Sequence, residues 1–120
     1  NCSLAHAEVV ALATTHGTLK QFDLGAPGMP KLTLVTSCEP CAMCYGAILW
    51  SGVRNVVCAA RGSDATAIGF DEAPKPKNWV TELEKRGISV VRDMCRAEAK
   101  EVFGLYRQTG GRIYNARKGS

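Results

Sequence analysis

Hydrophobic residues near the start of the chain recur every three or four positions, whereas further along they gather in short runs. The first pattern covers Leu4 to His16 and has the spacing of one face of a half-buried helix. We expect Ser3 to cap this helix and Gly17 to end it. The next apolar segment, residues 32–36, is short and rich in β-branched side chains, which favours a strand.

The rest of the chain continues this alternation up to a tail that begins after Gly110-Gly111. In order, we expect a helix at 40–51, a strand at 53–60, a loop with at most one helical turn at 61–73, a helix at 77–86, a strand at 88–91 and a helix that Asp93 caps and that ends near Gln108. Strands that alternate with helices predict a single α/β domain over residues 1–120. Neighbouring strands should be parallel, and helices should cover both faces of the sheet.

Composition and charge exclude some classes of protein. The chain carries 15 Lys and Arg against 11 Asp and Glu, a mildly basic balance that is more typical of a solvated surface than of a nucleic-acid-binding face. No apolar stretch approaches the roughly 20 residues that span a bilayer. We therefore expect neither a nucleic-acid partner nor a membrane segment.

Six cysteines allow two interpretations. An even number is compatible with three disulfides in a small secreted protein. Cys58, however, lies within an apolar run and has the character of a buried small hydrophobic residue, while Cys41 and Cys44 have the spacing of metal ligands. Free thiols fit a reducing compartment, so we expect a cytoplasmic protein.

Two separated motifs carry the candidate chemistry: His-Ala-Glu at 6–8 and Pro-Cys-Ala-Met-Cys at 40–44. One imidazole and two thiolates make three ligands for Zn²⁺, namely His6, Cys41 and Cys44. Three protein ligands leave the fourth tetrahedral position to water, as in catalytic zinc sites. Glu8 is not needed as a ligand, so we expect it to carry protons between that water and a substrate.

The position of these motifs at helix starts makes a geometric prediction. His6 and Glu8 are two positions apart, and such side chains point in nearly opposite directions in mid-helix. Only at the very start of a helix can both face one ion. The first and second helices should therefore direct their N-termini at a common point. The positive end of the second helix would favour thiolate over thiol at Cys41 and Cys44.

Two alternatives stay open at this point. Cys38 completes a Cys-x2-Cys-x2-Cys series, so a structural Cys3His zinc site without catalytic function is one of them. In such a site Glu8 would have no function. The other is a redox pair formed by Cys41 and Cys44, which would leave His6 unexplained as well.

H-x-E followed by P-C-x-x-C is the signature of zinc deaminases, and the chain resembles the cytidine-deaminase-like superfamily. Residues 36–48 look like the branch that holds guanine deaminases and tRNA adenosine deaminases. The segment 59–72, with Gly-Phe-Asp-Glu at its end, is similar to guanine deaminases. We expect no such motif in tRNA deaminases.

The resemblance implies a three-layer α/β/α fold around a central mixed sheet, and hydrolysis of guanine to xanthine and ammonia. It assigns zinc to three ligands, His6, Cys41 and Cys44, and proton transfer to Glu8. Glu72 would act as a second catalytic carboxylate on the purine, with neighbouring Asp71 as the alternative. Phe70 and Asp71 would contact the substrate.

The resemblance also bears on partners and extent. The chain matches the C-terminal two thirds of the family domain, so an N-terminal helix and strand hairpin are expected before it. Members of the family form homodimers in which the C-terminal segment can close over a neighbouring subunit's site, a role that suits residues 110–120. Related deaminases act on tRNA adenosine or on cytosine and cytidine, and these activities are the rival predictions. Small amino-triazines are a further class of substrate that the same site could accept.

Overall fold

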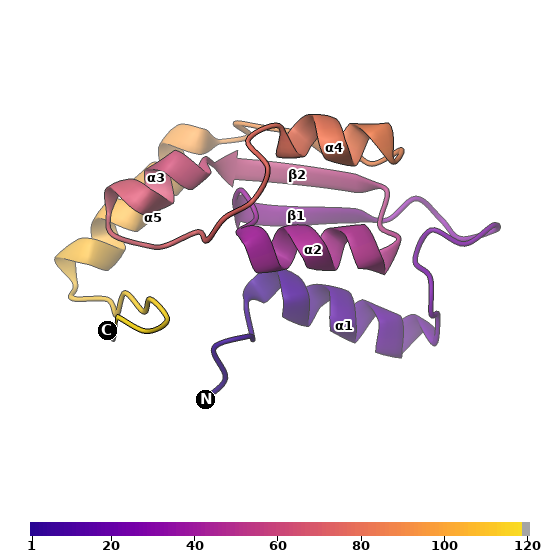
Figure 1. Cartoon of the computed structure of the whole chain (residues 1–120), viewed down its shortest axis with the longest axis horizontal. Helices are drawn as coiled ribbons and strands as arrows, with labels where there is room; N and C mark the ends of the chain where they lie inside the picture. Colours follow the sequence, from indigo (N-terminus) through magenta and orange to yellow (C-terminus); the bar gives the residue numbers. More distant parts are fainter. Residues whose placement is uncertain (119–120) are drawn as a thin grey trace.

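Helices and strands alternate in the computed structural model, which describes residues 1–118 (Figure 1). In chain order the elements are α1 (Ala7–Leu19), β1 (Thr33–Cys38), α2 (Ala42–Ser51), β2 (Asn55–Ala60), α3 (Gly62–Ala67), α4 (Trp79–Lys85), β3 (Ser89–Val91) and α5 (Arg96–Gln108). The alternating α/β order expected from the sequence is confirmed. None of the described helices has both the length and the apolar character needed to cross a membrane.

The three strands form a parallel sheet in the order β1-β2-β3. Each connection between neighbouring strands contains a helix, which returns the chain to the same end of the sheet, as parallel pairing requires. The mixed sheet implied by the family resemblance is not seen among residues 1–118, because both strand pairs are parallel.

The core lies on one face of the sheet. Every second residue of β2 is buried, and Val56 and Cys58 stand in register with Leu34 and Thr36 of β1. The same core contains Ile48 of α2 and Leu83 of α4, both fully buried. Helices α1 and α2 lie side by side along the sheet, and α4, which contacts β3, runs above β2 in the view of Figure 1. This packing fixes the direction in which each helix starts.

The opposite face of the sheet is only partly covered by the described residues. Val35, Val57 and Val91 stand opposite one another in the register, and Val35 is 72% and Val91 46% exposed. The expectation of helices over both faces is thus met incompletely, because the buried faces of α2 and α4 both belong to the core around Leu34 and Val56.

Helix α1 begins later and ends later than expected. His6 keeps an extended backbone (φ −65°, ψ 149°) and acts as the N-cap, so Leu4 and Ala5 stay outside the helix. Gly17 does not end the helix, because a glycine costs a helix interior only about 1 kcal/mol. The chain turns instead at Lys20, in the left-handed conformation (φ 53°).

Two further differences concern residues 61–73 and the start of α5. The loop expected there contains α3, whose first turn is closed by a capping box in which the Arg61 N–H donates to Asp64 Oδ2 at 2.8 Å. Asp93 does not cap α5; its carboxylate pairs with the Arg61 guanidinium at 2.8 Å, and Cys95 is the N-cap. Long-range ion pairs of this kind leave no periodic signal in the sequence.

Candidate active site

The N-termini of α1 and α2 meet, as the motif spacing predicts. His6 is the N-cap of α1 and Cys41 is the N-cap of α2, while Cys44 lies in the first turn of α2 and is fully buried. β1 delivers the chain to α2 through Pro40, and the packing of α1 against α2 brings the two helix starts together. Residues 35 positions apart thereby become neighbours.

Three ligand atoms of these residues form one cluster. His6 Nδ1 lies 3.5 Å from Cys41 Sγ and 3.6 Å from Cys44 Sγ, and all three atoms lie within 4.8 Å of one another. Tetrahedral zinc with a Zn–S bond of about 2.3 Å and a Zn–N bond of about 2.0 Å requires an S···N separation of about 3.5 Å. The donor set and its spacing therefore fit Zn²⁺.

The two thiols are electrostatically unequal. A hydrogen bond from the Cys44 thiol lowers the pKa of Cys41 to about 5, with the charge of His6 adding to the effect against partial burial. The same bond raises the pKa of Cys44, and its burial and the nearby Glu8 carboxylate raise it further. The pair thus holds one proton between two sulfurs, and a divalent cation must displace that proton to gain both thiolates.

Glu8 lies beside the cluster without joining it. Its Oε1 is 3.2 Å from Thr36 Oγ1 on β1, and its charge reaches Cys44. The Glu8 side chain is half-buried and does not line the cavity described below. Thr36 is a contact that the sequence reasoning missed, because nothing in a strand residue's pattern reports a partner 28 positions away.

Cys38 takes no part in the cluster. Its thiol faces the Arg61 carbonyl oxygen at 3.6 Å, and burial raises its pKa to about 12, which keeps it a neutral thiol. Among residues 1–118 the metal-compatible group contains one imidazole and two sulfurs. The alternative of a closed Cys3His site is therefore wrong in this structure, and the presence of His6 beside both thiols speaks against a simple redox pair.

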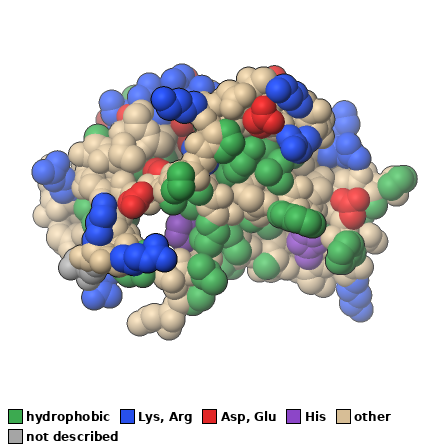
Figure 2. Space-filling model, viewed as in Figure 1, with side chains coloured by type: hydrophobic (Ala, Val, Ile, Leu, Met, Phe, Trp, Pro, Cys, Tyr) green, Lys and Arg blue, Asp and Glu red, His purple; other side chains and the backbone are tan. Residues whose placement is uncertain are grey.

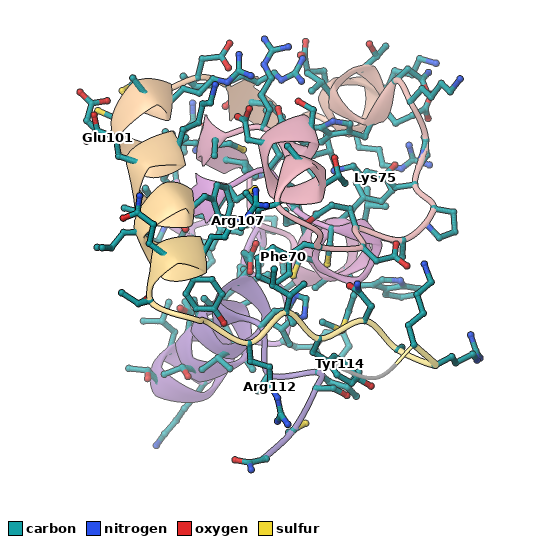
Figure 3. All side chains as sticks on the ribbon, turned by 90° about the vertical axis from the view of Figure 1, so that its left-hand side faces the viewer. Phe70, Lys75, Glu101, Arg107, Arg112 and Tyr114 are labelled. Atoms are coloured by element: carbon teal, nitrogen blue, oxygen red, sulfur yellow. The ribbon has the colours of Figure 1, made fainter. Side chains whose placement is uncertain are left out.

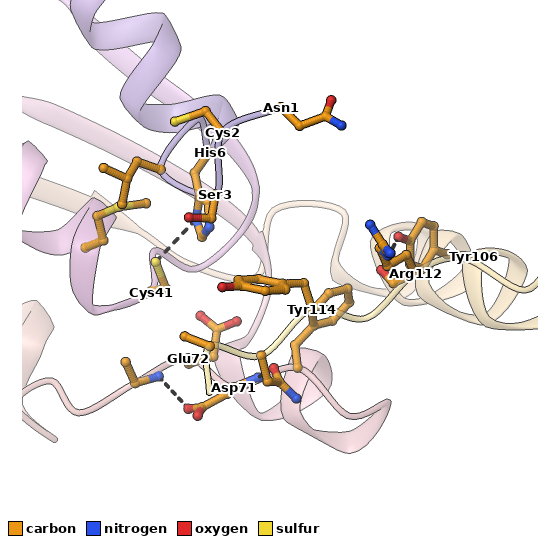
Figure 4. A pocket seen from close by; sticks show the side chains of 16 residues that line it. Asn1, Cys2, Ser3, His6, Cys41, Asp71, Glu72, Tyr106, Arg112 and Tyr114 are labelled. Carbon is orange, nitrogen blue, oxygen red and sulfur yellow. Dashed lines mark hydrogen bonds between the residues drawn. The ribbon is translucent and has the colours of Figure 1, made fainter. Parts of the chain in front are cut away.

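A cavity of about 760 Å³ opens over the cluster (Figures 2 and 4). Its wall is built from four parts of the chain: the N-terminal segment with His6, the start of α2 with Cys41, the loop 70–73 after α3, and the end of α5 with the tail 112–116. Figure 2 shows the hollow with a histidine and several basic side chains beside it. The cavity is large enough for a small heterocycle.

Glu72 faces this cavity from the wall opposite His6 (Figure 4). It is half-buried, and desolvation together with the charge of Cys41 raises the pKa of its carboxyl. Its backbone carbonyl accepts the Ala42 N–H at 3.0 Å, which ties the loop directly to the first residue of α2. The structure thus brings Glu72 to the cluster, as the resemblance implies.

Asp71 and Phe70 also line the cavity, with different surroundings. The Asp71 carboxylate accepts the Ala73 N–H at 2.9 Å, so it stabilises the turn of its own loop. Phe70 packs against two rings of α5, with centroid distances of 6.4 Å to Phe103 and 6.1 Å to Tyr106. These contacts favour Glu72 over Asp71 as the carboxylate that meets a ligand.

The C-terminal tail covers the cavity of its own chain. Asn115 accepts the Asp71 N–H at 2.8 Å and donates to the Gly69 carbonyl at 3.0 Å. Tyr114 points its ring into the space between Cys41 and Glu72 (Figure 4), and the tail passes beside Phe70 and α5 (Figure 3). The resemblance implied a tail that closes over a neighbouring subunit's site, whereas here the tail lies over the cavity of its own chain, and the sequence did not single out Asn115 as the residue that fastens it. Residues 119–120 lie outside the described residues.

Two helix starts on an α/β sheet bring together one imidazole, two thiols and nearby carboxylates. This arrangement is typical of domains with a catalytic metal site. The chain belongs to the cytidine and deoxycytidylate deaminase zinc-binding family, whose model matches residues 1–60. The family match covers the helix starts that carry both motifs.

Individual relatives show which members of this family the chain is similar to. The chain is 42% identical over 88 residues to a guanine deaminase of Bacillus subtilis, and this match covers 73% of the chain and 53% of the relative. It is 29% identical over 106 residues to a tRNA-specific adenosine deaminase of Buchnera aphidicola, covering 88% of the chain and 64% of the relative.

Solved structures agree with this placement. A guanine deaminase from Nitrosomonas europaea superimposes with a TM-score of 0.87 at 50% identity, covering 89% of this chain and 59% of that one. A structure in complex with 2,6-diaminopurine gives a TM-score of 0.89 at 52% identity, covering 97% and 61%. The chain therefore spans slightly more than half the length of its guanine deaminase relatives.

Proposed function

We propose that the protein is a zinc-dependent aminohydrolase that converts guanine and water to xanthine and ammonia. The observation that carries the proposal is the three-ligand cluster of His6, Cys41 and Cys44 beneath a cavity that Glu72 also lines. Similar solved structures hold the purine analogues 8-azaguanine and 2,6-diaminopurine, which supports a purine ligand. These three ligand residues would hold Zn²⁺.

The residues of this chain have distinct roles in the proposed reaction. Zinc, when bound, would supply the positive charge that makes water a nucleophile near neutral pH. Glu8 takes one proton from the attacking water and delivers it to the ring nitrogen; it then takes the second proton from the added hydroxyl group and delivers it to the amino group, which leaves as ammonia. The Thr36 hydroxyl holds the Glu8 carboxyl group in position during these transfers.

Glu72 acts at the opposite edge of the base. Its raised pKa, caused first by burial, makes a protonated carboxyl more accessible near neutral pH than for an exposed glutamate. A protonated carboxyl group both donates and accepts hydrogen bonds, so it can match a purine edge that carries a nitrogen acceptor next to an N–H donor. Phe70, fixed by two rings of α5, offers an apolar surface to the same ligand.

Ammonia release from a panel of substrates tests the proposal. Guanine, cytosine and an adenosine-bearing anticodon stem are presented to the zinc-loaded protein, and release from guanine alone is the expected result. Glu8→Ala should retain zinc and lose turnover, whereas Cys41→Ala should lose both. Release only from the anticodon stem would favour the tRNA-specific relatives, and full activity of Glu8→Ala would refute the proton-transfer role.

Two properties of the whole protein belong to the same proposal. We infer a homodimer, supported by large apolar side chains on the surface: Trp50 is 90% exposed, and the row with Val35 and Val91 is open. Light scattering on the purified protein measures this directly. We also infer a cytoplasmic location, supported by six free cysteines in the described chain, which suit a reducing compartment.

A further inference from the structure

Four side chains meet next to the start of α2, outside the cavity. Trp79, the first residue of α4, is 5% exposed. Lys75 Nζ lies 4.7 Å from the centroid of its ring and Arg92 Cζ lies 5.7 Å from it, both within the roughly 6 Å over which an aromatic face attracts a cation. Glu39 completes the group through a 2.6 Å salt bridge with Arg92. We call Lys75, Trp79, Arg92 and Glu39 the Trp79 cluster.

Lys75 connects this cluster to the loop that carries Glu72. Its ammonium donates a hydrogen bond to the Pro40 carbonyl, one residue before the ligand Cys41. Three positions earlier, the Glu72 carbonyl accepts the Ala42 N–H at 3.0 Å. The segment 72–75 is therefore bound to the start of α2 at both of its ends, and Lys75 (Figure 3) forms one of the two attachments.

Arg92 holds Glu39, the residue that precedes Pro40. The Glu39 side chain is 5% exposed, and its second carboxylate oxygen accepts the Gly62 N–H at 3.0 Å. Its backbone N–H donates to the Ala60 carbonyl at 2.8 Å. A carboxylate buried to this degree is stable only when it is paired, so Arg92, together with the Gly62 N–H, holds the Glu39 side chain.

The two cations thus hold the segment 39–40, which directly precedes Cys41, from two directions. Lys75 holds its far end at the Pro40 carbonyl and Arg92 holds the Glu39 side chain, while the buried ring of Trp79 keeps both cations in place. None of these groups lines the cavity, so their effect on a ligand there must be indirect. The residue that follows this segment is Cys41.

We propose that Lys75 and Arg92, held on the Trp79 ring, are positioning residues that set Cys41 opposite His6 and Glu72 at the wall of the cavity. Groups that orient metal ligands typically change metal affinity or activity by about 10- to 100-fold when they are removed. The kinetic part of this inference rests on the proposed function, whereas the metal-binding part does not.

Three variants at two neighbouring lysines test it. Lys75→Met removes the ammonium and keeps an unbranched side chain, and Lys75→Arg restores a cation. Lys77→Met is the matched control, because Lys77 is exposed and makes neither of the Lys75 contacts. The measurements are zinc affinity by competition with a chromophoric chelator, thermal unfolding, and kcat and KM for guanine.

We expect Lys75→Met to weaken zinc binding about 10-fold and to lower kcat by a similar factor, with KM unchanged. Lys75→Arg should recover most of both losses, and Lys77→Met should match the unmodified protein. Arg92→Lys, which keeps the charge but loses the guanidinium geometry, should show the same loss of zinc affinity. It provides a second route to the answer if Lys75→Met does not fold.

Two outcomes would overturn the inference. One is equal zinc affinity and kcat in Lys75→Met and Lys77→Met. The other is a lower melting temperature of Lys75→Met with zinc affinity and kcat unchanged, which would assign the Trp79 cluster to stability alone. If the unmodified protein binds zinc but releases no ammonia from guanine, the proposed function fails, and the comparison of zinc affinities still decides the positioning role.

Discussion

Replacing Thr36 with valine tests how Glu8 is held. The Thr36 hydroxyl lies 2.8 Å from the Cys38 carbonyl oxygen and 3.2 Å from Glu8 Oε1. A hydroxyl has one hydrogen to give and two lone pairs to accept with. It can donate to the carbonyl while accepting from a protonated Glu8, or turn and donate to the Glu8 carboxylate. Thr36 can therefore hold Glu8 both with and without the proton that it would carry.

Valine has nearly the shape of threonine but offers no hydrogen bond. A hydrogen bond to a charged group contributes about 1.5–3 kcal/mol, and each 1.36 kcal/mol changes a rate tenfold, so we expect Thr36→Val to lower kcat by about 10- to 150-fold. Zinc affinity should be unchanged, because Thr36 is not part of the ligand cluster. The assay is steady-state ammonia release from guanine, with zinc content measured in parallel.

Thr36→Ser is the control, since it keeps the hydroxyl and removes only a methyl group. If Thr36→Val turns over guanine as fast as Thr36→Ser, then Glu8 does not depend on this contact and the reasoning is wrong. A loss of zinc in Thr36→Val would show that the strand position supports the metal cluster instead.

Four other predictions concern the metal, the second carboxylate, the tail and the core. The pKa of Cys41 is lowered to about 5 and that of Cys44 is raised, so zinc must displace one proton from the two thiols at neutral pH. Zinc affinity, measured by chelator competition, should therefore rise about tenfold per pH unit. Below about pH 5 it should fall more steeply, because Cys41 is then protonated too. Glu72→Ala should keep zinc and lose most of its guanine turnover, and an unchanged rate would make Glu72 an ordinary loop residue. Asn115→Ala removes both hydrogen bonds of the Asn115 side chain and should raise KM without altering zinc affinity, as the same assays will measure. Ile48→Ala opens a cavity at a fully buried position and should lower the free energy of unfolding in urea by about 2–5 kcal/mol.

Local signals in the sequence were enough to predict the alternation of elements and the metal cluster. Short apolar runs marked the strands, and the two motifs at helix starts led directly to the meeting of His6 with Cys41 and Cys44. That meeting could be predicted because the spacing of His6 and Glu8 is compatible with a common target only at a helix N-terminus.

The features that were missed depend on contacts between distant residues. The first helix was expected to end at Gly17, but the turn is made by Lys20, a residue without conformational preference for that role. Asp93 was expected to cap a helix, and an ion pair with Arg61 uses its carboxylate instead. Partners 28 to 44 residues apart, as at Thr36 and Asn115, leave no periodic trace in the chain.

The attachment of the tail by Asn115 affects how ligands enter and leave the cavity. Asn115 ties the tail down with two hydrogen bonds, each worth a net of about 0.5–1.5 kcal/mol. Breaking these two bonds costs about 1–3 kcal/mol, and the bond that the Tyr106 hydroxyl donates to the Arg112 carbonyl adds to the cost of lifting the tail. At most about 15% of molecules would therefore have the tail lifted at any moment. A ligand could enter or leave the cavity only in that minority, so the bonds of the tail would slow both ligand binding and product release.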